Sequence, residues 1–470
     1  MRVGSITTGE GVSELIEQLV ALVGERRVLV GDVLSERASS YWNSSPTQAL
    51  ALVKPVSTEE VSRVLACCFE RDQRVVVQGG LTGVVAGAES SNDDVIISLE
   101  RMNQIETIDE RESVATVQAG VVLQTQQEEL ALRGLLFPLD LGPRGSCTIG
   151  GNVATNAGGI SVLRYGMVRN LLLGLEVVLM DGTVMSSMFP MLKNNTGYDL
   201  KQLFVGSEGT LGVATRVMVR LFPLPTSRQS AMVASDSFDS VIDLLNQFRT
   251  GLAGTLSAFE VMWQSYYRGV TGENDHKPPM SRDYPFYMMV EAEGFDAKTD
   301  QARFESILES AFENGLIVDA IVPKSERERG ELWLIREEFD PILPAYLYDV
   351  SLPIKHMMAY TQAIETRLAS ELDDARSVVF GHIADGNLHI FVTPYQDEQH
   401  HEAADAIIYS VLQEFGGSVS AEHGIGTEKI AWLNLNRSDE EINLMRAIKK
   451  SVDPKNLLNP GRLFTEESPI

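Results

Sequence analysis

Two glycine-rich segments, the first of which continues from a β-rich run, most constrain what this chain can fold into. The first is VVVQGGLTGVVAGA at 75–88, and the second is RGSCTIGGNVATNAGGIS at 144–161. Glycine admits positive φ and lets a ligand approach the main chain, so successive N–H groups can form an anion-binding nest. Tight turns alone would explain either segment. The two together favour a site for an extended phosphate-containing ligand such as a dinucleotide.

Neither segment is a common nucleotide-binding motif. No GK[ST] follows the glycines, which excludes a Walker loop, and 79–83 lacks the G-x-G-x-x-G spacing of a Rossmann fingerprint. The surrounding chain alternates β-rich runs with helical stretches, which predicts an α/β or α+β domain. The β-rich runs are 74–80, 94–99, 113–120, 175–185 and 212–225, and the predicted helices are 58–71 and 122–134.

The chain of 470 residues is too long for one ordinary core. Composition changes at 223–230, PLPTSRQS, where Pro and Ser follow a strand. Longer helices are predicted beyond this point, at 236–250, 297–315, 325–340, 355–371 and 402–415. We predict a first domain over 1–224, a second over 225–440, and a C-terminal segment, 441–470, that returns to the first domain.

The charge balance excludes two classes of partner. Sixty-five acidic against 39 basic residues give a net charge of −26, which repels nucleic acids and anionic membranes. A small anionic substrate would therefore need a local cationic pocket. Three cysteines without a paired framework fit a reducing cytosol. The most apolar stretch, 171–180, is far shorter than the roughly 20 residues of a membrane span, so a cytoplasmic protein without an integral membrane segment is expected.

Two histidines flank a DG pair in FGHIADGNLHIF at 380–391. A hairpin with Asp385 and Gly386 in a type I′ turn would place His382 directly opposite His389 on one face. Two imidazoles there can share one ion, and Glu422 or His423 of the later AEHG could complete a zinc-like site. A solvated hairpin that merely carries histidines is the alternative.

Arg336 is the candidate for a local positive charge. In GELWLIREEFDP it lies on a helical apolar stripe with Leu332 and Ile335, where a guanidinium needs an anionic partner. A bidentate fork suits a substrate carboxylate. The alternative is an arginine paired with a neighbouring acid, Glu331 or Asp340.

Seven ordered motifs carry a family resemblance. The chain resembles flavoproteins of the vanillyl-alcohol oxidase type, in the branch of FAD-linked D-2-hydroxy acid dehydrogenases. The motifs are QGGLTGVVAGA, PLDLGPRGSCTIGGNVATNAGG, RYGMVRNLLLGLEVVLMDGTV, FVGSEGTLGV, GHIADGNLH, SAEHGIGTEK and DPKNLLNPGRL. The resemblance implies an α+β fold. It implies a PCMH-type FAD-binding domain of two α+β subdomains and an α+β cap domain, the FAD-linked oxidase C-terminal domain, with an antiparallel sheet.

The resemblance also implies the residues that bind FAD. The pyrophosphate would lie on Gly79, Gly80, Leu81, Thr82 and Gly83. The ribityl chain and ring would be lined by Pro138, Gly145, Ser146, Thr148, Gly150, Gly151, Asn156 and Gly159. The adenine side would be reached by Glu208, Gly209, Gly212 and Val213, and Asn459 would return to the flavin. No histidine precedes His276, so the first domain cannot supply a histidyl–flavin bond and non-covalent FAD is expected.

By the same resemblance, His382, His389 and Glu422 bind a divalent metal, Zn²⁺ or a similar Mn²⁺, Co²⁺ or Fe²⁺, and His423 is the base. Arg336 would clamp the substrate carboxylate. Without the resemblance, either Glu422 or His423 could be the metal ligand. Neighbouring residues in a strand point to opposite faces, and the sequence does not show which of the two faces the histidine pair.

Two departures from the family pattern concern the substrate. Members that oxidise D-2-hydroxyglutarate carry a lysine just before the YD-x-SLP element and an asparagine two residues after the second metal histidine. This chain has Leu347 and Phe391 there. An apolar pair argues against a diacid and for a small or apolar acid such as D-lactate.

The leading hypothesis is an FAD- and metal-dependent dehydrogenase that oxidises a D-2-hydroxy acid to the 2-oxo acid by hydride transfer from C2 to flavin N5. Electrons would pass to electron-transfer flavoprotein, a quinone or another carrier, and a homodimer is an expected assembly. The alternatives are a D-2-hydroxyglutarate dehydrogenase, a metal-independent flavin oxidase of sugars or lactones, a non-enzymatic subunit, and a flavin-free metallohydrolase. The last leaves both glycine-rich segments without a role.

Overall fold

The computed structural model describes residues 9–272 and 275–465, so the outermost residues of the predicted first domain and C-terminal segment lie outside it. The described chain forms two compact units. Unit 1 contains the residues up to Gly158, Met167–Leu224 and those from Glu422 onwards, and unit 2 contains Gly159–Gly166 and Pro225–Ala421. The chain thus re-enters unit 1 at Glu422, whereas the sequence predicted 441.

The short insertion of Gly159–Gly166 into unit 2 has a local cause. It contains helix α6 (Val162–Tyr165), which packs against strand β13 (Leu256–Trp263). Arg164 Nη1 donates a hydrogen bond of 2.7 Å to the main-chain oxygen of Glu293, at the end of strand β14 (Phe286–Gly294). These contacts attach the segment to the sheet of unit 2.

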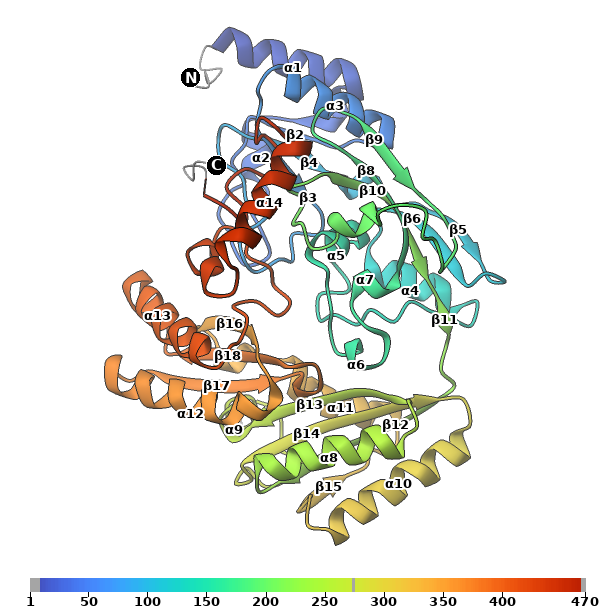
Figure 1. Ribbon diagram of the computed structural model, residues 1–470, viewed down its shortest axis with the longest axis vertical. Helices are drawn as coiled ribbons and strands as arrows, with labels where there is room; N and C mark the ends of the chain where they lie inside the picture. The colour runs from blue at the N-terminus through green and yellow to red at the C-terminus, as the bar shows by residue number, and fades with distance from the viewer. Residues whose placement is uncertain (1–8, 273–274, 466–470) are drawn as a thin grey trace. The chain divides into compact units, whose positions relative to one another are not determined.

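The first sheet of unit 1 has the strand order β1-β2-β4-β3. Strands β2, β4 and β3 run parallel, and β1 pairs antiparallel with β2. The strands are β1 (Val28–Leu29), β2 (Ala51–Val53), β3 (Val75–Gln78) and β4 (Val95–Ser98). After helix α14 (Asp439–Val452) the C-terminal segment returns to this sheet, where Leu458 forms a parallel bridge with Val75 (Figure 1).

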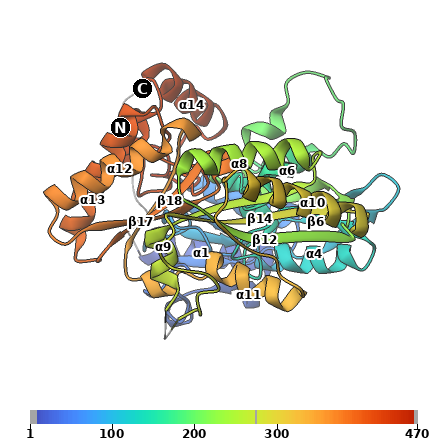
Figure 2. The same cartoon turned by 90° about the horizontal axis from the view of Figure 1, so that it is seen from below.

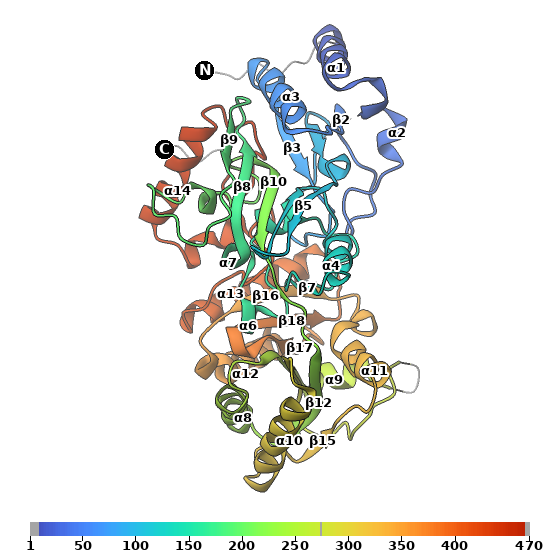
Figure 3. The same ribbon diagram turned by 90° about the vertical axis from the view of Figure 1, so that its right-hand side faces the viewer.

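The second sheet of unit 1 is antiparallel, with the order β5-β6-β10-β8-β9, and Figure 3 shows its strands side by side. A separate pair joins β7 to β11. The strands are β5 (Ile105–Asp109), β6 (Val114–Gln118), β7 (Leu135–Leu136), β8 (Leu172–Val178), β9 (Val184–Ser187), β10 (Val213–Arg220) and β11 (Phe222–Pro223).

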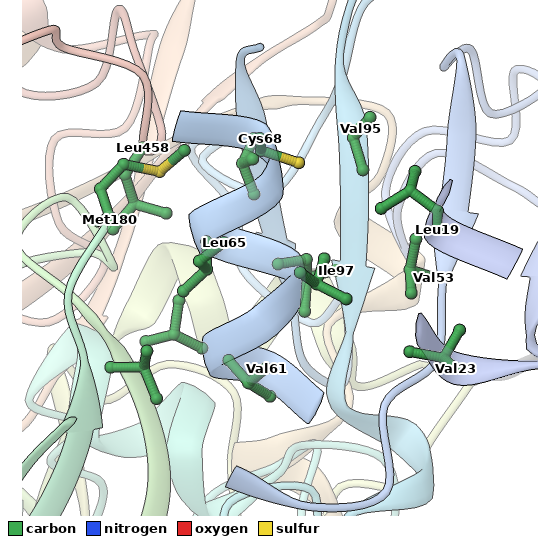
Figure 4. Close-up of a cluster of buried hydrophobic side chains, with 14 of the residues drawn as sticks. Leu19, Val23, Val53, Val61, Leu65, Cys68, Val95, Ile97, Met180 and Leu458 are labelled. Atoms are coloured by element: carbon green, nitrogen blue, oxygen red, sulfur yellow. The ribbon is translucent and has the colours of Figure 1, made fainter. Parts of the chain in front are cut away.

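Helix α3 (Thr58–Glu70) joins the two sheets of unit 1 through one hydrophobic core. Ser57 caps its N-terminus by accepting a hydrogen bond from the N–H of Glu60, which confirms the predicted start. Its buried side chains, among them Val61 and Leu65, pack with residues of both sheets and of the C-terminal segment (Figure 4). The other helices of unit 1 are α1 (Gly9–Val23), α2 (Asp32–Ser35), α4 (Leu123–Ala131), α5 (Ile149–Thr155) and α7 (Val168–Leu171).

Unit 2 is built on one antiparallel sheet with the order β15-β12-β14-β13-β17-β18-β16. Helices α8 (Phe238–Gly251) and α10 (Ala297–Glu313) cover one face of β12 and β14, and α9 (Gln264–Val270) and α11 (Glu326–Glu337) lie on the other (Figure 2). The remaining elements are β12 (Ser227–Ser235), β15 (Asp319–Ile321), β16 (Tyr346–Ser351), β17 (Arg376–Gly381), β18 (Asn387–Thr393), α12 (Ile354–Glu371) and α13 (Glu398–Glu414).

Candidate functional site

The histidine pair lies at the β17–β18 connection, but the predicted hairpin is wrong. Phe380, rather than His382, pairs with His389. The connection is a 3-10 turn over Ile383–Asp385, closed by hydrogen bonds of 3.2 Å to the main-chain oxygen of His382 from the N–H groups of Asp385 and Asn387. A type I′ turn needs positive φ at both central residues, and here only Gly386 has it, at 93°.

The two imidazoles nevertheless face each other. Their ring centroids are 5.3 Å apart in a T-shaped arrangement. A ligand nitrogen of each ring lies within 4.8 Å of one on the other. Both side chains are buried, at 5% exposure for His382 and 8% for His389. The pair can therefore supply two nitrogen ligands to one cation.

Each of the two histidines presents its Nδ1 atom to a buried carboxylate of unit 2. His382 Nδ1 lies 2.7 Å from Oε1 of Glu260, a hydrogen bond. His389 Nδ1 lies 3.9 Å from Oδ1 of Asp349, its cross-strand partner on β16. The hydrogen bond to Glu260 favours the tautomer of His382 in which Nδ1 carries the proton, which leaves Nε2 with its lone pair.

Glu260 also holds the arginine that the sequence singled out. Its Oε2 atom accepts Nε of Arg336 at 2.8 Å and lies 2.6 Å from Nη2. Arg336 stacks over the ring of Phe380, 4.4 Å from its centroid. The predicted anionic partner is therefore Glu260, and neither Glu331 nor Asp340. Burial opposes ionisation of Glu260, but its interactions with His382 and Arg336 outweigh this, so its pKa lies below the ordinary value.

Asp349 fixes the last residues of unit 2 before the chain re-enters unit 1. Its Oδ2 atom accepts the main-chain N–H of Ala421 at 3.0 Å and the hydroxyl of Ser420 at 3.3 Å. Its Oδ1 atom accepts the amide of Asn387 at 2.7 Å. Glu422 follows Ala421 by one peptide bond, so its Cα lies about 3.8 Å from the anchored residue.

In unit 1 the two glycine-rich segments pack against each other. A Cβ atom on Gly80 would lie 2.8 Å from the Cα of Cys147, so only glycine fits there. The second segment contains the short helix α5, whose N-terminus Thr148 caps by accepting from the N–H of Gly151. Gly80 is thus required for the packing of the two segments against each other, in addition to any role in binding a ligand.

The first segment also offers unused donors. Within the described chain, the N–H groups of Gly80, Leu81, Thr82 and Gly83 donate to no other residue. Leu81 has φ of 57°, the left-handed value that turns successive N–H groups toward one side. Main-chain donors of this kind fit a pyrophosphate.

Glu208 organises the segment that carries Glu422 and His423. Its carboxylate accepts the N–H of Ile425 at 2.8 Å and that of Gly426 at 2.7 Å, and its main-chain oxygen accepts the amide of Asn459 at 2.8 Å. Burial raises the pKa of Glu208, although the two N–H groups act in the opposite direction. The segment is not a strand, so the strand argument about its side chains does not apply.

Comparison with known proteins agrees with this arrangement. The protein-family model described as FAD linked oxidases, C-terminal domain, matches residues 224–463. A second family model, for an FAD binding domain, matches residues 49–187. A mitochondrial D-2-hydroxyglutarate dehydrogenase of Rattus norvegicus is 39% identical over 87% of this chain and 77% of its own length. That of Stutzerimonas stutzeri is 34% identical over 96% of this chain and 98% of its own length.

The chain belongs to the FAD-linked oxidase family. It is a flavin-dependent oxidoreductase acting on a CH–OH group, as predicted, and oxidation of a D-2-hydroxy acid is the reaction class that its relatives support. A putative D-lactate dehydrogenase of Schizosaccharomyces pombe is 36% identical over 87% of this chain and 80% of its own length. Among solved structures, p-cresol methylhydroxylase shares the fold with a TM-score of 0.78 at 18% identity, covering 98% of this chain and 99% of that one.

The oxidase fold distributes the remaining predicted flavin residues over several elements. Asn459 is buried and links β3 to the 208–209 turn, because its Oδ1 atom accepts the N–H of Val77 at 2.9 Å. Gly150 faces Ala119 and not open space. Gly159 belongs to unit 2. The others lie in the chain before α5, in or at the end of α5, in the turn before β10, and at the first residue of β10: Pro138, Gly145, Ser146, Gly151, Asn156, Gly209, Gly212 and Val213.

The two substrate candidates of this FAD-linked oxidase are direct partners in the sheet. Leu347 on β16 pairs with Phe391 on β18. Alternate residues of a strand share a face, so Phe391 points to the same side as His389, about 7 Å along the strand. Phe391 is fully buried, with ring centroids 5.2 Å from Phe339 and 5.7 Å from Phe380.

Sequence reasoning about the oxidase missed Glu260. It lies in LSAFEVMW, a strand whose eight residues are all buried. The available signal was a single acid inside an apolar strand, since a buried carboxylate must have a partner. No helix of the described chain is long and apolar enough to span a membrane.

Proposed function

We propose that the protein is a dehydrogenase dependent on FAD and a divalent cation, which oxidises a small or apolar D-2-hydroxy acid such as D-lactate to the 2-oxo acid. The observation that carries this proposal is the cluster of unit 2. There, His382 and the buried Arg336 share one carboxylate, that of Glu260, and the ring of His389 faces that of His382. A ligand for a cation and a donor for a substrate carboxylate are thus held by the same carboxylate of unit 2.

Unit 1 would hold the FAD. The unused N–H groups of Gly80–Gly83 suit the pyrophosphate. When bound, the flavin supplies a hydride acceptor for C2 of the substrate. We propose that the cofactor is bound without a covalent link, as the absence of histidine before His276 suggests.

His382, His389 and Glu422 would hold the cation. Two imidazole nitrogens and a carboxylate form a set that suits zinc or a similar ion. The connection of Glu422 to the anchored Ala421 supports its inclusion. A bound divalent cation would polarise the substrate hydroxyl as a Lewis acid.

His423 would take the hydroxyl proton, since imidazole is suited to proton transfer near neutral pH. Arg336 would bind the substrate carboxylate. Its Nε and Nη2 atoms point to Glu260, and Nη1 donates to none of the described residues, so one donor edge remains for a substrate. Arg336 would thus provide a local positive charge for an anionic substrate, which the net charge of −26 would otherwise repel.

The pair of Leu347 and Phe391 supports an acid without a distal charge. Phe391 is fully buried beside two aromatic rings. It therefore offers no charged or polar group that could bind a second carboxylate of the substrate. The alternative is D-2-hydroxyglutarate, which the names of the relatives favour. Electrons would leave through electron-transfer flavoprotein, a quinone or another carrier.

Anaerobic reduction of the purified yellow protein tests the proposal. We expect D-lactate to bleach the flavin faster than L-lactate and D-2-hydroxyglutarate, and EDTA to stop the bleaching until Zn²⁺ or Mn²⁺ is restored. Faster bleaching by D-2-hydroxyglutarate would establish the alternative substrate. Bleaching that survives EDTA, with rapid reoxidation by oxygen, would indicate a metal-independent oxidase.

A further inference from the structure

One carboxylate connects the two binding functions of unit 2. Glu260 lies in the middle of β13, between β14 and β17, and its side chain is 1% exposed. Each of its two oxygens is used by a different element. Oε1 contacts His382, in the turn after β17, and Oε2 contacts Arg336, on α11.

The contact with His382 determines which nitrogen of that ring can bind a cation. A carboxylate paired with a guanidinium is ionised and only accepts hydrogen bonds. The bond of 2.7 Å to Oε1 therefore requires the proton on Nδ1 of His382. Nε2 then keeps its lone pair, which is the form a metal ligand needs.

The contact with Arg336 determines the direction of the guanidinium. Two of its nitrogens, Nε and Nη2, lie 2.8 and 2.6 Å from Oε2, and its plane lies over Phe380. The planar group is thus held along one edge and one face. Its Nη1 edge, without a partner among the described residues, keeps a fixed direction.

We propose that Glu260 is a positioning residue that sets both the cation affinity, through His382, and the binding of the substrate carboxylate, through Arg336. This inference rests on the proposed cation site. It predicts that loss of one charge, without any change in size, weakens two kinds of binding that otherwise involve different side chains.

A buried ion pair is weak evidence for a purely stabilising role, because apolar residues of similar volume often replace such pairs without loss of stability. Glu291 provides a comparison within the same sheet. It is buried on β14 and binds Arg329 at 2.9 Å and the indole N–H of Trp333 at 3.0 Å, both on α11. Glu291 therefore attaches the same helix to the sheet without contacting the histidine pair.

The experiment compares Glu260→Gln with the control Glu291→Gln in the full-length FAD-loaded protein. An amide keeps the shape of the side chain, but it cannot accept from both His382 and Arg336 with a full charge, and its NH₂ can donate to Nδ1 and reverse the tautomer. Zn²⁺ affinity is measured by competition with a chromophoric chelator. KM and kcat are measured at saturating Zn²⁺ for the D-2-hydroxy acid that reduces the flavin. FAD content and Tm are also recorded.

For Glu260→Gln we expect Zn²⁺ affinity to fall about 10–100-fold, the range found for residues that orient metal ligands, and KM to rise by a similar factor. Glu260→Asp, which keeps the charge, is expected to recover part of the Zn²⁺ affinity. Glu291→Gln is expected to leave both constants within about twofold, because it reaches neither group.

Two results would overturn the role of Glu260: equal effects of the two glutamine variants, or a loss confined to either Zn²⁺ affinity or KM. A wild-type protein that binds no divalent cation would instead overturn the proposed cation site itself. The two failures are thus distinguishable by the Zn²⁺ titration of the wild-type protein.

Discussion

Glu208 accepts the main-chain N–H of Ile425 at 2.8 Å, although the two residues are 217 positions apart in the chain. The other carboxylate oxygen accepts the next N–H, that of Gly426, at 2.7 Å. A Cβ atom on Gly424 would lie 2.8 Å from the same carboxylate, so the chain approaches it closely. The resemblance had placed Glu208 on the adenine side, and the structure shows its carboxylate fixing the segment of Glu422 and His423.

The pH dependence of stability tests the state of Glu208. Burial raises its folded-state pKa, so its contribution to stability is fully present below the unfolded pKa and is lost as the pH rises through the folded value. The variant Glu208→Gln does not titrate there. We expect the Tm of the wild-type protein, relative to that of this variant, to fall as the pH rises above the ordinary glutamate value of 4.5. If the Tm of the wild-type protein instead rose relative to that of Glu208→Gln as the pH increased, the pKa of Glu208 would not be raised by folding.

Arg336→Lys tests the substrate clamp. An ammonium can contact Glu260 or a substrate carboxylate, but it lacks the planar fork that reaches both. Loss of one charged hydrogen bond costs about 1.5–3 kcal/mol, so KM is expected to rise ~10–100-fold with a smaller change in kcat. Arg329→Lys, on the same helix and paired with Glu291, is the control. Equal KM values for the two variants would exclude Arg336 from substrate binding.

The histidine hairpin shows how far the sequence determines this site. The DG pair is typical of a type I′ turn, and it predicted the correct two strands and the meeting of the two imidazoles. The register was wrong by two residues, since Phe380 rather than His382 pairs with His389. The 3-10 turn buries Ile383 completely, and burial of an isoleucine outweighs the local preference of a tight turn.

The contacts of Glu260 could not be predicted from the sequence. It is 76 residues from Arg336 and 122 residues from His382, and no local pattern connects them. The sheet order, in which β13 lies between β14 and β17, brings the three together. Helix α11, which carries Arg336, was predicted at 325–340 because its cap and periodicity are local, whereas the order of strands depends on packing between distant segments.

Gly80→Ala tests the contact between the two glycine-rich segments. The new methyl group would meet the main chain of Ser146 and Cys147, which cannot rotate away. We expect a loss of about 1–3 kcal/mol in the free energy of unfolding and a lower content of bound FAD. Gly142→Ala, where no atom lies within 4 Å of the added Cβ, is the control. Normal flavin content and stability in Gly80→Ala would contradict the packing.

Leu347→Lys tests the substrate side chain. Leu347 is only partly buried, so a lysine there can extend toward its neighbours without a large cost in stability. Its charge is expected to raise kcat/KM for D-2-hydroxyglutarate relative to D-lactate by ~10-fold or more, as for one charged hydrogen bond. Leu347→Met controls for the change in shape. A wild-type protein that already prefers the diacid would show that the apolar pair does not select the substrate.

His423→Ala and Glu422→Ala separate the base from the ligand, which the sequence could not do. If His423 is the base, its alanine variant keeps Zn²⁺ and FAD but reduces the flavin about 10²–10⁴-fold more slowly. If Glu422 is a ligand, its alanine variant loses Zn²⁺, as does His382→Ala. His400→Ala is the control, since this histidine lies on α13 and bonds Asp397. Zinc content and single-turnover flavin reduction are measured for all four proteins, and loss of zinc in His423→Ala with retention in Glu422→Ala would reverse the two roles.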